Sequence, residues 1–132
     1  MLEVLEIEST KRNDLIDITA EVSAAVSRAR IESGVCYLYI PHATAGVTIN
    51  ENADPTVRFD IIKKLDSLVP RDENYTHPEG NSDSHVKSSI MGTTLTIIIK
   101  DGSLVLGTWQ GIYFCEFDGP RSRKIYVKTI EG

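Results

Sequence analysis

The three histidines are the residues best suited to chemistry at neutral pH, and each lies where an expected element begins or ends. His42 follows the apolar run VCYLYI, His77 lies in a polar stretch, and His85 opens a short helical segment. Sites are usually built from side chains at strand ends and in loops, on a rigid scaffold. Three neutral imidazoles with an open position predict a site for zinc or a similar divalent ion. The alternative is that each histidine is a structural or solvated residue.

The spacing of the histidines matches no metal motif on a single helix. His77 and His85 are eight residues apart, unlike the histidines of HExxH. A shared site would therefore require long-range folding, or neighbouring copies of the chain, to bring the rings together.

Groups that bind anions lie close to the histidines in the sequence. The run GNSDS precedes a short expected helix, and backbone N–H groups and hydroxyls at such a position form an anion cradle. We expect Asn81, Ser82 and Ser84 to contribute to it, with Lys87 adding a positive charge. Arg121 and Arg123, in the turn DGPRSR, carry guanidinium groups that can grip a phosphate. The alternatives are a well-capped helix and a solvated turn.

A second set of polar candidates lies at the ends of two other expected strands. Asn50 and Glu51 come at the end of the strand GVTIN, and Glu51 has no evident structural duty. Trp109 and Gln110 begin a further strand, where an aromatic ring beside an amide suits a flat ligand. A tryptophan in the core or at an interface is the alternative.

The elements expected to position these residues form an α+β fold, with antiparallel β-sheets in a sandwich-like arrangement and two main helices. Apolar residues at helical spacing predict a first helix that starts near Asp17 or Thr19 and ends at Gly34. The stretch DPTVRFDIIKKLDSLVP predicts a second helix, with Asp54 as N-cap and Pro55 at the first position. Residues 70–84 predict a long loop, followed by a short helix that ends before the strands of the C-terminal part.

Strands are expected over residues 2–9 and in the runs VCYLYIPH, GVTIN, TLTIIIK, SLVLGTW, WQGIYFCEF and RKIYVKTIE. Asp101-Gly102 predicts a hairpin turn between two of them. The run VCYLYI does not alternate in polarity, so we expect this strand to be buried on both faces. The length of the chain favours one domain, residues 1–132.

Charge and composition exclude several partners. The net charge of -5 gives no global attraction to nucleic acid or to an anionic membrane. The start MLEVLEIEST carries acids where a signal peptide carries bases, and no apolar run approaches the ~20 residues of a membrane span. We therefore expect a cytoplasmic protein. Cys36 and Cys115 each lie inside an apolar run and are expected to be small buried hydrophobes.

Four blocks of sequence, in this order and spacing, resemble the YjbQ family of small proteins, often labelled secondary thiamine-phosphate synthases. The blocks are DITAEV (17–22), PHATAGVTINEN with Asp54 (41–54), YTHPEGNSDSHVKSSIMG (75–92) and LGTWQGIYFCEFDGPRSRK (106–124). The resemblance covers nearly the whole chain. It implies an α+β fold, a homotrimer, and a pocket in which His42, His77 and His85 gather around a metal.

The resemblance also implies a weak thiamine-phosphate synthase activity, which joins a pyrimidinylmethyl diphosphate to a thiazole phosphate and releases diphosphate. We therefore expect a transferase in which the three histidines bind a divalent metal, with zinc as the preferred ion, and act in catalysis together with Glu51. Magnesium would be a second cation, bound with diphosphate. The small phosphorylated metabolite would be bound by Asn50, Asn81, Ser82, Ser84, Lys87, Trp109, Gln110 and Arg121.

Two other functions fit the same residues. A trimer could hold a metal or a phosphorylated metabolite without turnover. A metal-dependent hydrolase is the other possibility, in which metal-bound water attacks a phosphoester and Glu51 or Glu116 acts as the base. Glu116 and Asp118 share one strand face, so they could instead bind a metal–diphosphate or face water. The residues alone do not separate these functions.

Overall fold

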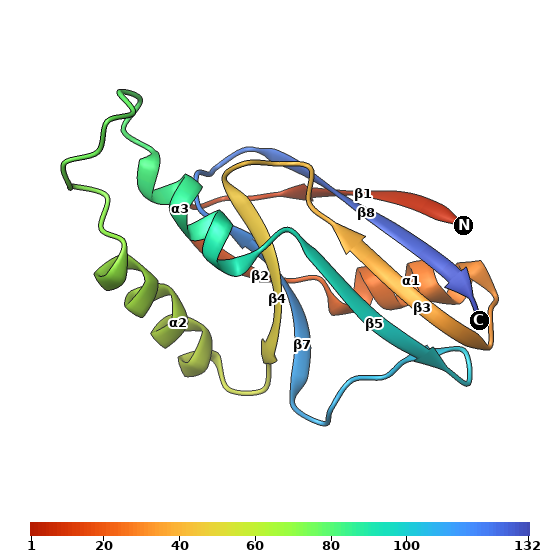
Figure 1. The fold of residues 1–132 in the computed structure, drawn as a ribbon. Helices are drawn as coiled ribbons and strands as arrows, with labels where there is room; N and C mark the ends of the chain where they lie inside the picture. The colour runs from red at the N-terminus through yellow and green to blue at the C-terminus, as the bar shows by residue number, and fades with distance from the viewer.

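The structure, a computed structural model, describes every residue from Met1 to Gly132. Its elements are β1 (Leu2–Glu8), β2 (Asp14–Asp17), α1 (Thr19–Ala29), β3 (Ser33–Tyr39), β4 (Ala45–Glu51), α2 (Pro55–Leu68), α3 (Ser82–Met91), β5 (Thr94–Lys100), β6 (Ser103–Leu104), β7 (Gln110–Glu116) and β8 (Ser122–Glu131). One antiparallel sheet has the strand order β1-β8-β3-β5-β6, and the other has the order β2-β7-β4. The expected α+β fold with antiparallel sheets is therefore confirmed (Figure 1).

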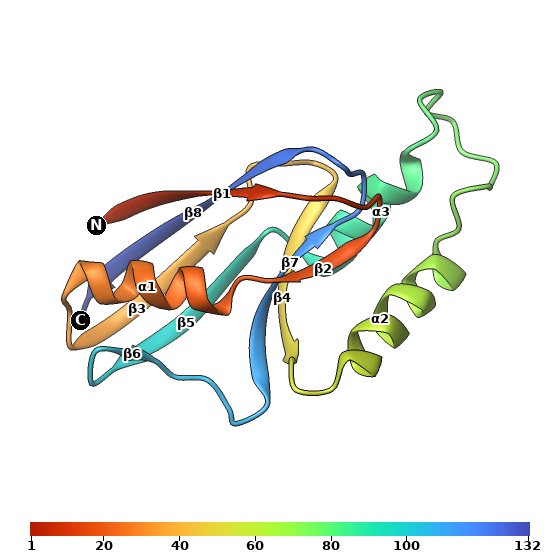
Figure 2. The same cartoon turned by 180° about the vertical axis from the view of Figure 1, so that it is seen from behind.

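The main core lies where the inner faces of the two sheets meet α1, which crosses the five-stranded sheet (Figure 2). Val22, Ala25 and Val26 form the buried face of α1, as their helical spacing predicts. The helix ends earlier than expected, at Arg30 in a left-handed conformation, and Gly34 instead lies within β3. Both cysteines are buried and unpaired, as expected.

Two short features near the sheets differ in how well the sequence indicates them. Asp101 and Gly102 both adopt positive φ and connect β5 to β6, so the predicted hairpin is confirmed. Strand β2, which pairs with β7, was not predicted, because four residues are too few to show a strand period.

Helix α2 has the predicted start but a weaker attachment to the core than its sequence suggests. Asp54 accepts a hydrogen bond from the backbone N–H of Thr56 at 2.9 Å, so the predicted N-cap is confirmed. Only Leu65 of this helix is buried, whereas Phe59 and Leu68 are more than 60% exposed. Leu65 packs in a small second cluster under the three-stranded sheet.

The outer face of the five-stranded sheet is uncovered in the single chain and carries large apolar side chains among charged ones such as Glu6, Lys124 and Lys128. Along β3, Cys36 and Leu38 point into the core, whereas Tyr37 and Tyr39 are 44% and 50% exposed. The expectation that this strand is buried on both faces is therefore wrong for the isolated chain, because α1 covers only the inner face. Further large apolar side chains are exposed on the outer face of the same sheet: Leu2, Val4, Ile98 and Ile130.

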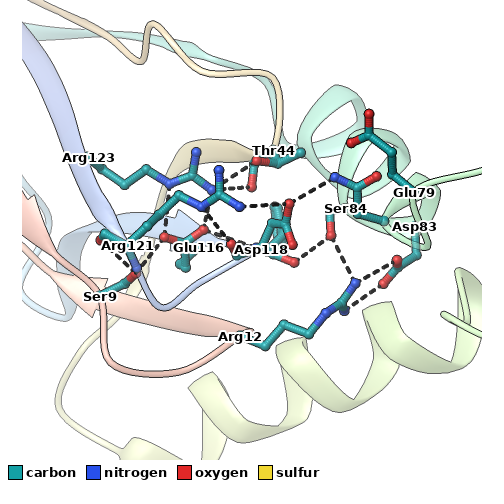
Figure 3. Close-up of polar contacts among 12 residues, drawn as sticks. Ser9, Arg12, Thr44, Glu79, Asp83, Ser84, Glu116, Asp118, Arg121 and Arg123 are labelled. Atoms are coloured by element: carbon teal, nitrogen blue, oxygen red, sulfur yellow. Dashed lines mark hydrogen bonds and ion pairs between the residues drawn. The ribbon is translucent and has the colours of Figure 1, made fainter.

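A buried charge network ties α2 and α3 to the loop before β2. The Lys87 ammonium donates hydrogen bonds to Asp66 of α2 and Asp83 of α3, and the side chains of Lys87 and Asp83 are at most 1% exposed. Arg12 binds both oxygens of Asp83 at 3.0 Å (Figure 3). Burial alone would raise the pKa of Asp83, but the hydrogen bonds from Arg12 and Lys87 lower it below its ordinary value. The Asp83 carboxylate therefore stays ionised at neutral pH.

None of the three helices combines the length and the apolar character that crossing a bilayer requires.

Replacing Lys87 with Met should lower the free energy of unfolding by about 3–5 kcal/mol, because the carboxylates of Asp66 and Asp83 would lose a buried partner. Denaturant unfolding followed by circular dichroism measures this change. Lys63→Met, at an exposed position of α2, is the matched control and should stay within about 0.5 kcal/mol of the wild type. A Lys87→Met loss no larger than that of the control would show that the network contributes nothing.

Candidate functional site

His42 accepts a hydrogen bond from the part of β8 that extends beyond the pairing of β8 with β3. The pairing of β3 with β8 stops at Tyr39 and Tyr126, so the backbone N–H of Lys124 has no partner in β3. That N–H donates instead to Nε2 of His42 at 2.9 Å. A backbone amide can only donate, so Nε2 must carry the lone pair, and the proton of the neutral ring lies on Nδ1.

The surroundings of His42 keep its ring neutral. Partial burial lowers the pKa of His42, and the positive charge of Arg123 lowers it further. The nearby carboxylate of Glu116 acts in the opposite direction, but the pKa still falls below its ordinary value. At neutral pH His42 is therefore an uncharged imidazole with a fixed tautomer.

His77 and His85 lie against each other. Their ring centroids are 5.5 Å apart and the planes are nearly perpendicular, at 87°. His85 belongs to the first turn of α3, where the backbone oxygen of Asn81 accepts hydrogen bonds from the N–H groups of Ser84 and His85. His77 comes from the long loop between α2 and α3 and also lies 3.7 Å from a carboxylate oxygen of Glu79.

Two hollows meet at His85, and together they carry all three histidines. The His42 hollow, of about 470 Å³, is lined by His42, Ala43, His85, Ser88, Ser89, Gly92 and Thr93. The His77 hollow, of about 400 Å³, is lined by Tyr75, Thr76, His77, Ser82, His85 and Val86. The structure thus brings the histidines to one surface, although not around one point.

Close packing of α3 against the edge of β4 places His85 near His42. The hydroxyl of Ser88 donates to the backbone oxygen of Ala45 at 2.6 Å. A side chain on Gly46 would put its Cβ 2.7 Å from the backbone oxygen of Gly92, so only glycine permits this approach.

The three-histidine metal pocket expected from the sequence is wrong for this chain. No three or more histidine, cysteine or acidic side chains are placed so that they could hold a metal ion. A neutral imidazole has one lone pair, and that of His42 is already bound to the Lys124 amide. A cation that arrives with the ligand, such as magnesium with diphosphate, stays a prediction.

Most of the expected phosphate-binding groups near α3 are engaged inside the protein. Ser84 is buried and donates to the backbone oxygen of Phe117 at 2.6 Å, and Lys87 forms the ion pairs described above. Arg121 folds back onto its own turn, where Nε donates to the backbone oxygen of Asp118 at 2.9 Å. Asn81 also donates to Asp118, at 2.9 Å, which leaves Ser82 as the member of this set that lines a hollow.

The second set of candidates lies at the opposite end of the three-stranded sheet. Strands β4 and β7 pair from Ala45 with Glu116 to Glu51 with Gln110. Six residues of strand span ~20 Å, so this set cannot share a hollow with the histidines of the same chain. Its side chains mostly serve the turn there: Asn50 accepts from the Glu51 N–H and Gln110 accepts from the Gly107 N–H, both at 2.7 Å, while Trp109 is exposed.

The sequence analysis missed a buried ion pair that lies directly behind His42. Nε of Arg123 donates to Oε1 of Glu116 at 2.9 Å, and Nη2 of Arg123 donates to the hydroxyl of Thr44 at the same distance (Figure 3). Ser9 donates to the same carboxylate at 2.7 Å. The side chains of Arg123 and Glu116 are at most 3% exposed, so Glu116 neither faces water nor is available as a base.

A sequence signal for this pair exists. Arg123 has the same strand parity as Ile125 and Val127, which places it on the inward face of β8. An arginine on an inward face requires a buried acid, and Glu116 follows a run of apolar residues.

Comparisons with known proteins agree along the whole chain. Residues 3–132 match the model of a family described as UPF0047 protein YjbQ-like. UPF0047 protein MJ1081 of Methanocaldococcus jannaschii is 55% identical over 98% of this chain and 94% of its own length. UPF0047 protein YugU of Bacillus subtilis is 51% identical over 98% of this chain and 99% of its own length. A crystal structure of a YjbQ/UPF0047 family protein from Clostridium acetobutylicum has a TM-score of 0.95 and 49% identity, and covers 97% of this chain and 99% of its own.

These names correct the predicted function. The relatives are named only as UPF0047 proteins. A similar structure from Sulfolobus solfataricus is described as a YbjQ-like protein of unknown function. It has a TM-score of 0.96 and 27% identity, and covers 100% of this chain and 97% of its own. The predicted thiamine-phosphate synthase function with a three-histidine metal pocket is wrong, since no such name occurs among them and the pocket is absent. The metal-dependent hydrolase depended on the same pocket and is withdrawn with it. The resemblance itself is confirmed by the family match over nearly every residue, and the chain belongs to the UPF0047 YjbQ-like family.

Proposed function

We propose that the chain binds a small molecule carrying an oxyanion of the phosphate class, and that the anion lies in the His77 hollow. The observation that carries this proposal is the convergence of two imidazoles on the start of α3. His77 and His85 line the hollow together with the hydroxyl-bearing Thr76 and Ser82. The first N–H groups of a helix have no partner within it and attract anions.

The charge around this helix start favours an anion despite a nearby acid. Asp83 lies in the first turn of α3, but its carboxylate is fully buried and neutralised by Arg12 and Lys87. The anion would therefore meet imidazole nitrogens, hydroxyls and the positive end of the helix, and it would have to displace the exposed carboxylate of Glu79, which lies 3.7 Å from His77. An imidazole that binds a proton donates from both nitrogens, which suits an oxyanion with several acceptor oxygens.

We further propose that the protein is a homotrimer assembled through the outer face of the five-stranded sheet. Exposed aromatic and aliphatic side chains of β1, β3, β5 and β8 gather on this face among charged side chains, and so many exposed large apolar groups on one sheet face are typical of an interaction site. A second copy of the chain is the occupant that fits, because self-association covers the same surface on every protomer at once. A hollow lined by Glu6, Glu8, His42, Lys124 and Tyr126 adjoins this face, so a neighbouring copy would sit beside His42.

Replacing His85 with Ala should weaken the binding of inorganic phosphate at least about tenfold, because a hydrogen bond to a charged group contributes about 1.5–3 kcal/mol. Calorimetric titration at low salt measures the affinity. Asn50→Ala, at the far end of β4, is the matched control and should bind phosphate like the wild type. Equal binding by the wild type and His85→Ala, or no binding by the wild type, would refute the proposal.

Replacing Tyr37 and Ile98 together with Glu should convert the trimer into monomers, because buried unpaired carboxylates are strongly unfavourable. Sedimentation equilibrium gives the mass, and circular dichroism checks that the fold is kept. Phe59→Glu on α2 changes an equally exposed apolar residue and should leave the trimer intact. A wild-type protein that is monomeric at micromolar concentration would contradict the assembly.

A further inference from the structure

We propose that His42 acts as a fixed hydrogen-bond donor, presenting Nδ1–H to the ligand, and that the backbone of Lys124 and the side chain of Arg123 are its positioning groups. The inference deepens the proposed function, on which it rests for the presence of a ligand. It gives His42 a role different from that of a metal ligand or a base.

The direction of the hydrogen bonds follows from the contacts of the ring. Nε2 accepts the Lys124 N–H at 2.9 Å, which fixes the only lone pair of the neutral imidazole. Nδ1 makes no hydrogen bond within the chain and is not among its buried polar atoms. The remaining ring N–H is therefore free to meet a ligand, and the His42 hollow is the one of the two hollows lined by His42 that also reaches His85.

The loop that carries His42 is anchored on both sides. Before it, the N–H of Ile40 donates to the backbone oxygen of Thr93 at 2.8 Å. After it, Thr44 receives hydrogen bonds from Arg123 and from the backbone N–H of Phe117. A donor whose backbone and ring are both fixed loses little conformational entropy when a ligand binds.

The charges that face His42 oppose its conversion into a cation. Arg123 and Arg121 disfavour protonation, whereas Glu116 favours it, and Arg123 has the largest effect of these three. A protonated ring would also have to give up the bond from the Lys124 amide, because Nε2 would then carry a proton. The ring therefore selects ligands by the direction of a hydrogen bond rather than by charge.

The class of ligand follows from the two hollows that share His85. An anionic group would occupy the His77 hollow, and a neutral acceptor would meet Nδ1–H of His42 in the adjoining one. Carbonyl, hydroxyl and ester oxygens are such acceptors. The molecule would thus carry an oxyanion at one end and an uncharged oxygen acceptor further along.

The test is the tautomer of His42 in the ligand-free protein, read from ¹⁵N shifts and long-range ¹H–¹⁵N correlations of ¹⁵N-histidine-labelled protein at neutral pH. We expect a protonated Nδ1 and an unprotonated Nε2, with the exposed His77 as the reference in the same spectrum. A proton on Nε2 of His42 would overturn the inference.

Two variants of Lys124 test the positioning role. Lys124→Ala keeps the backbone N–H, so the proton of His42 should stay on Nδ1. Lys124→Pro removes this donor, so the proton should become distributed over both ring nitrogens. The N–H that proline removes donates to His42 and not to a neighbouring strand, although Lys124 itself lies opposite Glu6 of β1, so circular dichroism must show that the variant folds. A folded Lys124→Pro with an unchanged tautomer would overturn the role of the amide. If Lys124→Pro does not fold, Arg123→Lys replaces it, and an unchanged tautomer with equally rigid His42 resonances would overturn the role of Arg123.

Titrations with inorganic phosphate and with zinc chloride separate this inference from the proposed function. Phosphate should shift His77 and His85, and failure to do so while His42 keeps its tautomer would refute the proposed function alone. Zinc should leave the Nε2 resonance of His42 in place. A stoichiometric zinc-induced shift of that resonance would overturn the donor role.

Discussion

The ion pair between Arg123 and Glu116 is the interaction on which the site depends, because it joins the two sheets at the end where the histidines lie. Arg123 belongs to β8 of the five-stranded sheet and Glu116 ends β7 of the three-stranded sheet. Burial alone would raise the pKa of Glu116, but the hydrogen bonds from Arg123 and Ser9 lower it below its ordinary value, so the carboxylate stays ionised. Breaking a buried pair of this kind typically costs about 3–5 kcal/mol, which makes the joint rigid.

The Arg123–Glu116 ion pair also explains why the protein can orient the imidazole ring of His42, which lies at the surface. The guanidinium group holds Thr44, two residues after His42, while the next residue of the same strand supplies the N–H that His42 accepts. One short segment of β8 thus fixes the loop and the ring together. On the other side, the second charge network, centred on Lys87, holds α3 and therefore His85.

The outcome for the candidate residues follows from their position along two strands. Sequence blocks identified the family and the histidines, but Glu51 and Trp109 lie a full strand length away from His42 in the same chain. Lys87 was expected to add a positive charge to an anion cradle, yet its partners Asp66 and Asp83 come from two different helices. Spacing along a chain cannot show such partners, because they meet only after the helices pack.

The sequence by itself determined the local elements and the family. Apolar periodicity placed α1, Asp54 and Pro55 started α2, and Asp101-Gly102 closed a hairpin, because each depends on the conformational preferences of a few adjacent residues. Only the tertiary structure decided that the three imidazoles line two adjoining hollows rather than one metal centre, and that one face of the large sheet stays uncovered. Those features depend on which atoms of distant segments reach hydrogen-bonding distance, and a single lone pair, that of His42, is committed by a backbone amide 82 residues away.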